Sequence, residues 1–127
     1  MIVVDTSALL AVVQGAPAAA ACMEMLGRND LVMSAATLAE ALIAASRRDV
    51  AAEMQRLIDG LAIEIAAVTR ADAFRVAAAY ARWGKGADPA GLNYGDCFAY
   101  VLASGADLPL LFVGEDFART DVRRALP

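Results

Sequence analysis

Histidine is absent from all 127 residues of the chain. This absence excludes Ser-His-Asp and Cys-His hydrolases, zinc sites with imidazole ligands and RNA cleavage by paired imidazoles. The only two cysteines, Cys22 and Cys97, form no CxxC pair, so we expect buried, reduced thiols rather than a zinc site or a disulfide. Any chemistry in this chain must therefore depend on carboxylates.

Long apolar segments are also missing. The apolar opening MIVV has no basic leader and ends at Asp5, which argues against a secretory signal. No later run reaches about 18 residues without a charge, so no membrane-spanning helix is expected. The length and the 60% hydrophobic content predict a single domain over residues 1–127, and a cytoplasmic location is expected by default.

Positive charge is scarce, with 11 Lys and Arg against 15 Asp and Glu and a net charge of −4. Proteins that act on nucleic acids usually present a basic surface to the phosphates. However, setting aside four acids of special interest leaves eleven, which matches the number of basic residues. The rest of the surface is then formally neutral, and bound cations would offset the remainder.

Those four acids lie at predicted junctions between structural elements. They are Asp5 in MIVVDTSALL, Glu40 in SAATLAEAL, Asp96 in LNYGDCFAY and Asp116 in LFVGEDFARTD. Carboxylate oxygens suit Mg²⁺ or Mn²⁺ equally well, and a bound cation generates a nucleophile from water without an imidazole base. This pattern indicates phosphodiester hydrolysis.

Apolar runs alternate with helical segments along the chain. Strands are predicted over residues 2–4, 31–33, 63–68 and 108–113, and helices over 8–13, 18–26, 35–46, 50–61, 71–83 and 94–104, with a short terminal helix from residue 117. Strands joined through helices imply a parallel sheet covered on both faces, with ligands beyond the carboxyl ends of the strands. The predicted class is α/β.

Each of the four acids also has a structural interpretation as a helix cap. Asp5 and Asp116 precede predicted helices, Thr37-Leu38-Ala39-Glu40 fits a capping box, and Asp96 falls three residues after Asn93. Taken singly, capping explains each acid about as well as a functional role does. Taken together, capping does not explain why the neighbouring positions are mostly apolar or small, and a carboxylate at the mouth of an apolar helix needs a partner.

With these motifs, MIVVDTSALLAVV, SAATLAEAL, LNYGDCFAYVLA and LLFVGEDFARTDV, the chain resembles PIN-domain ribonucleases of the VapC type, the toxins of bacterial type II toxin–antitoxin pairs. The resemblance covers nearly the whole chain. It implies a three-layer α/β/α sandwich and a metal-dependent endoribonuclease. It also implies Asp5 and Asp96 as the principal Mg²⁺ ligands, with Glu40 and Asp116 completing the pocket.

The resemblance implies further residues and partners. Thr6 is expected to orient Asp5, and Thr120 and Asp121 to assist after the fourth acid, while Glu115 departs from the Asp or Asn often found there. An RNA substrate, a VapB-like antitoxin that crosses the pocket and a homodimer are expected. The apolar faces of helices 18–26 and 50–61 are the candidate dimer surfaces.

Two other functions stay open. A PIN-like module that only binds its partner would keep the same acids without turnover. Phosphotransfer through an aspartyl-phosphate would need a lysine near the phosphoryl group, and the sole lysine, Lys85, lies in a predicted loop.

Overall fold

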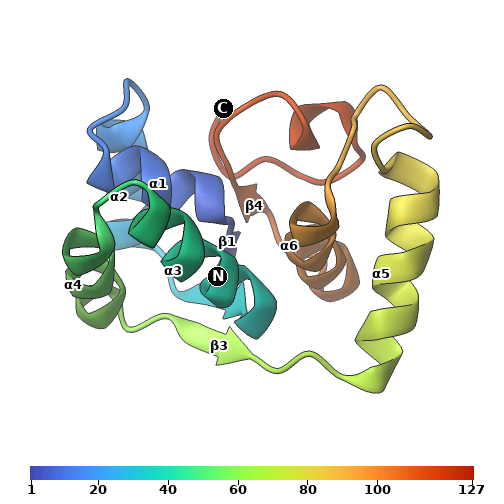
Figure 1. The fold of residues 1–127 in the computed structure, drawn as a ribbon, viewed down its shortest axis with the longest axis horizontal. Coiled ribbons are helices and arrows are strands. Elements are labelled where there is room, and N and C mark those ends of the chain that lie inside the picture. Colours follow the sequence, from blue (N-terminus) through green and yellow to red (C-terminus); the bar gives the residue numbers. More distant parts are fainter.

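The computed structural model describes residues 1–127 and contains one sheet of four parallel strands in the order β3-β2-β1-β4 (Figure 1). The strands are β1 (Ile2–Val4), β2 (Leu31–Ser34), β3 (Glu64–Ala66) and β4 (Leu110–Leu111). The chain leaves β1 on the β2 side and returns on the other side as β4. The carboxyl end of β1 is therefore the switch point at which open parallel sheets bind ligands.

Six α-helices and one 3₁₀ turn join the strands. They are α1 (Thr6–Val13), α2 (Ala19–Arg28), α3 (Ala35–Arg47), α4 (Ala51–Leu61), α5 (Arg70–Trp83), α6 (Tyr94–Ala106) and η1 (Phe117–Arg119). The predicted order of elements is confirmed. The runs 63–68 and 108–113 contain shorter strands than predicted, because β3 and β4 are edge strands that pair only with the residues opposite them.

Helices cover both faces of the sheet, which confirms the α/β/α sandwich. Val3 of β1 points into a core cluster that includes Tyr100 of α6 and Val76 of α5. Ile2 and Val4 point the other way, into a cluster built with α1 to α4. This alternation follows from the two-residue period of a strand, and it explains why β1 is apolar at every position.

Cys22 and Cys97 are both free and buried, as predicted. Cys22 packs in the cluster on one face of the sheet and Cys97 in the cluster on the other, so the sheet separates them. Burial raises the pKa of both thiols, and for Cys97 the nearby Asp96 contributes to a value of about 11. Neither thiol is a reactive nucleophile at neutral pH.

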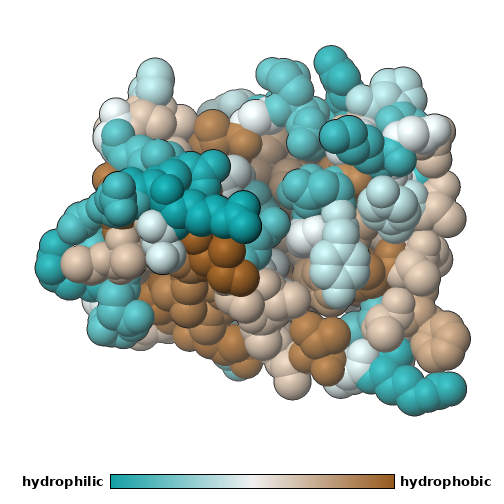
Figure 2. All heavy atoms as spheres, in the orientation of Figure 1, coloured by the Kyte–Doolittle hydropathy of each residue, from teal (hydrophilic) through white to brown (hydrophobic).

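The candidate dimer helices α2 and α4 expose little apolar surface apart from Met23 of α2. The apolar sides of α2 and α4 are turned inward, where Cys22, Leu26 and Met54 are fully or almost fully buried. On the face shown in Figure 2, apolar residues gather instead over α3 and β3, where Ile43 and Ile65 are exposed. None of the helices has the length and apolar character required to cross a bilayer.

Candidate active site

Asp5 lies directly after β1, and its backbone N–H donates to the carbonyl of Leu111 in β4. Its side chain caps α1, because Oδ2 accepts from the backbone N–H of Ser7 at 3.0 Å and from the Ser7 hydroxyl at 2.6 Å. The other oxygen, Oδ1, is buried and has no hydrogen-bond partner. The capping interpretation is therefore correct for one oxygen, and it leaves the other unexplained.

The Ser7 side chain orients Asp5. The Ser7 hydroxyl donates to Asp5 and accepts from the backbone N–H of Val113, which joins the start of α1 to the segment after β4. Sequence reasoning missed this residue, although a serine two positions after a helix-capping aspartate is a local signal for such a bond. The Thr6 hydroxyl does not contact Asp5, because it faces α3.

Glu40 is held by Thr6 across 34 residues of sequence. The Thr6 hydroxyl lies 2.8 Å from Oε1 of Glu40 and 3.2 Å from the carbonyl of Thr37. The predicted helix start at residue 35 is confirmed, and the Ser34 hydroxyl caps it by accepting from the N–H of Ala36, so the alternative of a capping box over residues 37–40 does not hold. Glu40 therefore lies inside the helix and points toward α1 and α6.

Asp96 is the third residue of α6 and completes a capping box with Asn93. The Asn93 side chain accepts from the Asp96 N–H at 2.8 Å, and Oδ2 of Asp96 accepts from the Asn93 N–H at 3.0 Å. The predicted cap at Asn93 is confirmed. As at Asp5, one carboxylate oxygen is anchored, and Oδ1 receives no hydrogen bond from the protein.

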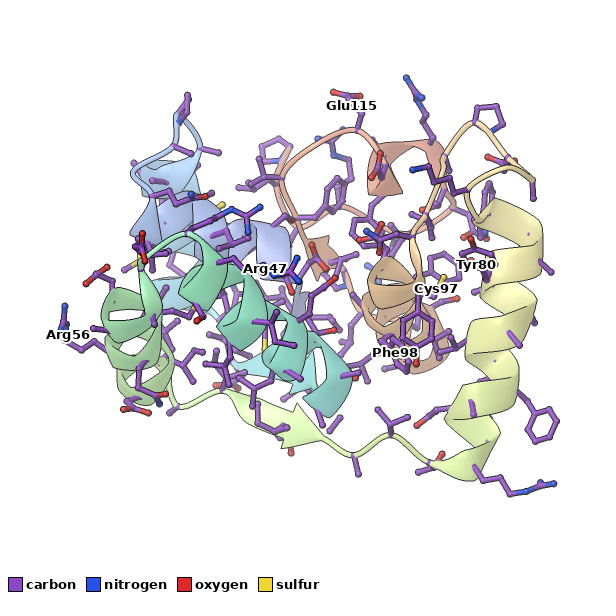
Figure 3. The ribbon with its side chains drawn as sticks, viewed as in Figure 1. Arg47, Arg56, Tyr80, Cys97, Phe98 and Glu115 are labelled. Carbon is purple, nitrogen blue, oxygen red and sulfur yellow. The ribbon has the colours of Figure 1, made fainter.

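Asp116 lies in the loop after β4 and is exposed. It precedes η1 but makes no side-chain capping bond, so the capping interpretation is wrong here. Figure 3 shows its neighbour Glu115 pointing outward from the same loop, and it labels Cys97 and Phe98 on α6, directly after Asp96. Asp116 is thus the most open of the four acids.

The four acids influence one another electrostatically. Burial raises the pKa of Asp96 to about 7, with contributions from the charges of Asp5, Glu40 and Asp116. Burial also raises the pKa of Asp5 to about 6, with a contribution from Glu40. No lysine or arginine forms an ion pair with any of the four acids. Asp5, Glu40 and Asp116 therefore all lie within electrostatic range of Asp96, and none of the four acids is ion-paired.

The remaining predicted residues lie elsewhere or serve the fold. Thr120 closes a turn by donating to the carbonyl of Phe117 and accepting from the N–H of Val122. Asp121 accepts from the Tyr100 hydroxyl at 2.6 Å and lies 3.6 Å from Arg82. The structure does not bring Asp121 into the acidic pocket, because these partners hold it near the C-terminal half of α6.

The donor chemistry of the pocket fits a divalent cation. Asp5 presents a buried oxygen without a hydrogen bond, and carboxylate oxygens are the ligands that Mg²⁺ and Mn²⁺ prefer. No three acidic side chains stand close enough together to form a ready-made ligand set. The side chains would therefore have to move closer together to share one ion.

The PIN domain family matches the chain over residues 2–123. Ribonuclease VapC42 of Mycobacterium tuberculosis is 43% identical over 97% of this chain and 98% of its own length, and ribonuclease VapC28 of the same organism is 40% identical over 98% and 97%. This chain therefore belongs to the PIN-domain family and, within it, to the VapC type.

Solved structures share the fold. The crystal structure of Mycobacterium tuberculosis VapC20, described as a toxin that cleaves the sarcin–ricin loop, covers 100% of both chains with a TM-score of 0.81 and 15% identity. A toxin–antitoxin complex from Klebsiella pneumoniae matches 95% of this chain and 93% of its own with a TM-score of 0.70 and 20% identity. At these identities the likeness concerns the fold alone.

Proposed function

We propose that this protein is a metal-dependent endoribonuclease, the toxin of a type II toxin–antitoxin pair. The family supports a nuclease, and the relatives named above are ribonucleases. The metal dependence is inferred from this chain's own residues, since it has no histidine and gathers four acids at the switch point of its sheet.

One observation carries the proposal. In each of the three inner acids, one oxygen is anchored by a hydrogen bond and the other is not. Ser7 anchors Oδ2 of Asp5, Thr6 anchors Oε1 of Glu40, and Asn93 anchors Oδ2 of Asp96. Hydrogen bonds of this kind orient metal ligands and leave the second oxygen available. Helix capping alone would not require three such residues in one pocket.

The roles of the acids follow from this arrangement. Asp5 and Asp96 would be the principal ligands through their free Oδ1 atoms, and Glu40 and Asp116 would complete the set. When bound, the cation would lower the pKa of a water ligand and stabilise charge on the phosphodiester. The free oxygen of Glu40, or the exposed carboxylate of Asp116, would accept a proton from the attacking water.

Cleavage of bacterial RNA by antitoxin-free protein tests the proposal. We expect cleavage with Mg²⁺ or Mn²⁺ that is lost in EDTA and in Asp96→Asn. Asp72→Asn is the matched control, because Asp72 occupies the same position of a capping box in α5, with Thr69, but lies outside the pocket. Full activity in folded Asp96→Asn, or equal loss in both variants, would contradict the assignment of Asp96 as a ligand.

A VapB-like antitoxin, an RNA substrate and a homodimer are the partners we propose. The antitoxin is supported by the fold shared with proteins from toxin–antitoxin complexes, among them VapBC2 from Rickettsia felis bound to promoter DNA. A basic antitoxin segment would suit the uncompensated acids electrostatically. This pairing is tested by asking whether the toxin co-purifies with the product of an adjacent gene. The complex should dissociate at high salt.

A further inference from the structure

Four glycines lie within helices, which is unusual because glycine destabilises a helix relative to alanine by roughly 0.5–1 kcal/mol. They are Gly27 in α2, Gly60 in α4, and Gly95 and Gly105 in α6. An added Cβ would meet nothing within 4 Å at Gly27, Gly60 or Gly105. Only at Gly95 is the position that a Cβ would take already occupied by another residue.

The group that fills this space is the carboxylate of Glu40. A Cβ on Gly95 would overlap Oε2 of Glu40 and would lie 2.7 Å from its Cδ and 3.2 Å from its Oε1. Oε2 is the oxygen that receives no hydrogen bond from the protein, whereas Thr6 anchors Oε1. Gly95 also directly precedes Asp96. Glu40 of α3 therefore occupies the space that a side chain at position 95 would need, next to Asp96.

We propose that Gly95 is a positioning residue, whose missing side chain allows the carboxylate of Glu40 to reach the first turn of α6 beside Asp96. The backbone at Gly95 does not itself require glycine, because its φ lies outside the left-handed region. The effect of Gly95 on metal binding rests on the proposed function, whereas the steric relation between Gly95 and Glu40 is independent of that function.

Alanine at position 95 would displace Glu40 without disrupting the fold. The overlap involves the end of a flexible side chain and not backbone, so Glu40 can rotate away. Rotation removes it from Thr6 and from Asp96, and the pocket loses one carboxylate. Loss of a group that completes or orients a metal site typically weakens metal binding ~10–100-fold.

Binding of Mn²⁺ alone, followed by the electron paramagnetic resonance of the free ion, tests this role. We expect Gly95→Ala to weaken binding ~10-fold or more. Gly105→Ala, in the same helix, should leave it unchanged. In a Glu40→Ala background, Gly95→Ala should have no further effect, because no carboxylate is left to displace. Unchanged binding in Gly95→Ala, or equal weakening with and without Glu40, would overturn the inference.

A second measurement needs no metal. In EDTA, the shift in urea midpoint caused by Thr6→Val should be smaller in Gly95→Ala than in wild type, because the bond to Glu40 is already lost. An equal shift in both backgrounds would overturn the inference. If wild type itself binds no Mn²⁺, the proposed function fails, and this comparison still decides whether Gly95 positions Glu40.

Discussion

Replacing Asp5 by asparagine in the metal-free protein tests the electrostatics of the pocket directly. Burial raises the pKa of Asp5 from 3.8 to about 6. The folded state therefore holds this proton more tightly than the unfolded chain. The resulting stability is complete below about pH 4 and is lost as the pH rises through 6. Since one pKa unit corresponds to about 1.4 kcal/mol, ionised Asp5 costs the fold ~3 kcal/mol at pH 8.

Asparagine removes this cost and keeps the cap. Its side-chain oxygen can still accept from Ser7, and asparagine is as good a helix cap as aspartate. In EDTA at pH 8 we expect Asp5→Asn to be ~1–3 kcal/mol more stable than wild type, the lower figure allowing for a buried amide that must find an acceptor. Urea unfolding followed by circular dichroism measures the difference.

The pH dependence provides the decisive check. The advantage of Asp5→Asn should grow between about pH 4 and pH 7, because only wild type carries this titrating group. A destabilised Asp5→Asn at pH 8, or a difference that does not change with pH, would refute the reasoning. Mg²⁺ should reduce this difference, since binding at 100 times Kd stabilises wild type by about 2.7 kcal/mol and the variant gains less.

Four further substitutions distinguish effects on the acidic site from effects on the stability of the fold. In EDTA at pH 8, urea unfolding should show Asp96→Asn more stable and Asp72→Asn less stable than wild type, because the pKa of Asp96 is raised and that of Asp72 is lowered; shifts of the same sign would contradict this. Ser7→Ala should cost ~1–3 kcal/mol of stability and weaken Mn²⁺ binding, since it removes two hydrogen bonds at Asp5 and Val113. Tyr100→Phe should lower the free energy of unfolding by ~1 kcal/mol and leave the Mn²⁺ affinity unchanged. A loss of affinity would show that the hydrogen bond between Tyr100 and Asp121 contributes to the metal site.

Sequence reasoning performed best where the determining interactions are local. The capping box of Asn93 and Asp96 is readable because its partners are three residues apart and precede an apolar helix. The same spacing at Thr37 and Glu40 does not mark a cap, because that helix begins at residue 35, as predicted, and Ser34 caps it. A spacing of three identifies a pair on one helix face, but it does not locate the start of the helix.

The residues after β4 show that sequence patterns do not predict side-chain directions in irregular segments. Thr120 and Asp121 follow the fourth acid closely in sequence, yet their side chains bond to a turn and to Tyr100 of α6. No local pattern shows which way an irregular segment turns its side chains. The direction is set by contacts 21 residues away, which become visible only once α6 is packed against the sheet.

The sequence by itself determined which side-chain chemistries are absent and the order of elements in this protein. The absence of histidine excluded imidazole chemistry, and the apolar run before Asp5 placed this acid at the carboxyl end of the first strand. Only the tertiary structure decided how Glu40 joins them, through Thr6 from one side and the empty space at Gly95 from the other. These contacts span 34 and 55 positions, and so they depend on helix packing, which no local periodicity encodes.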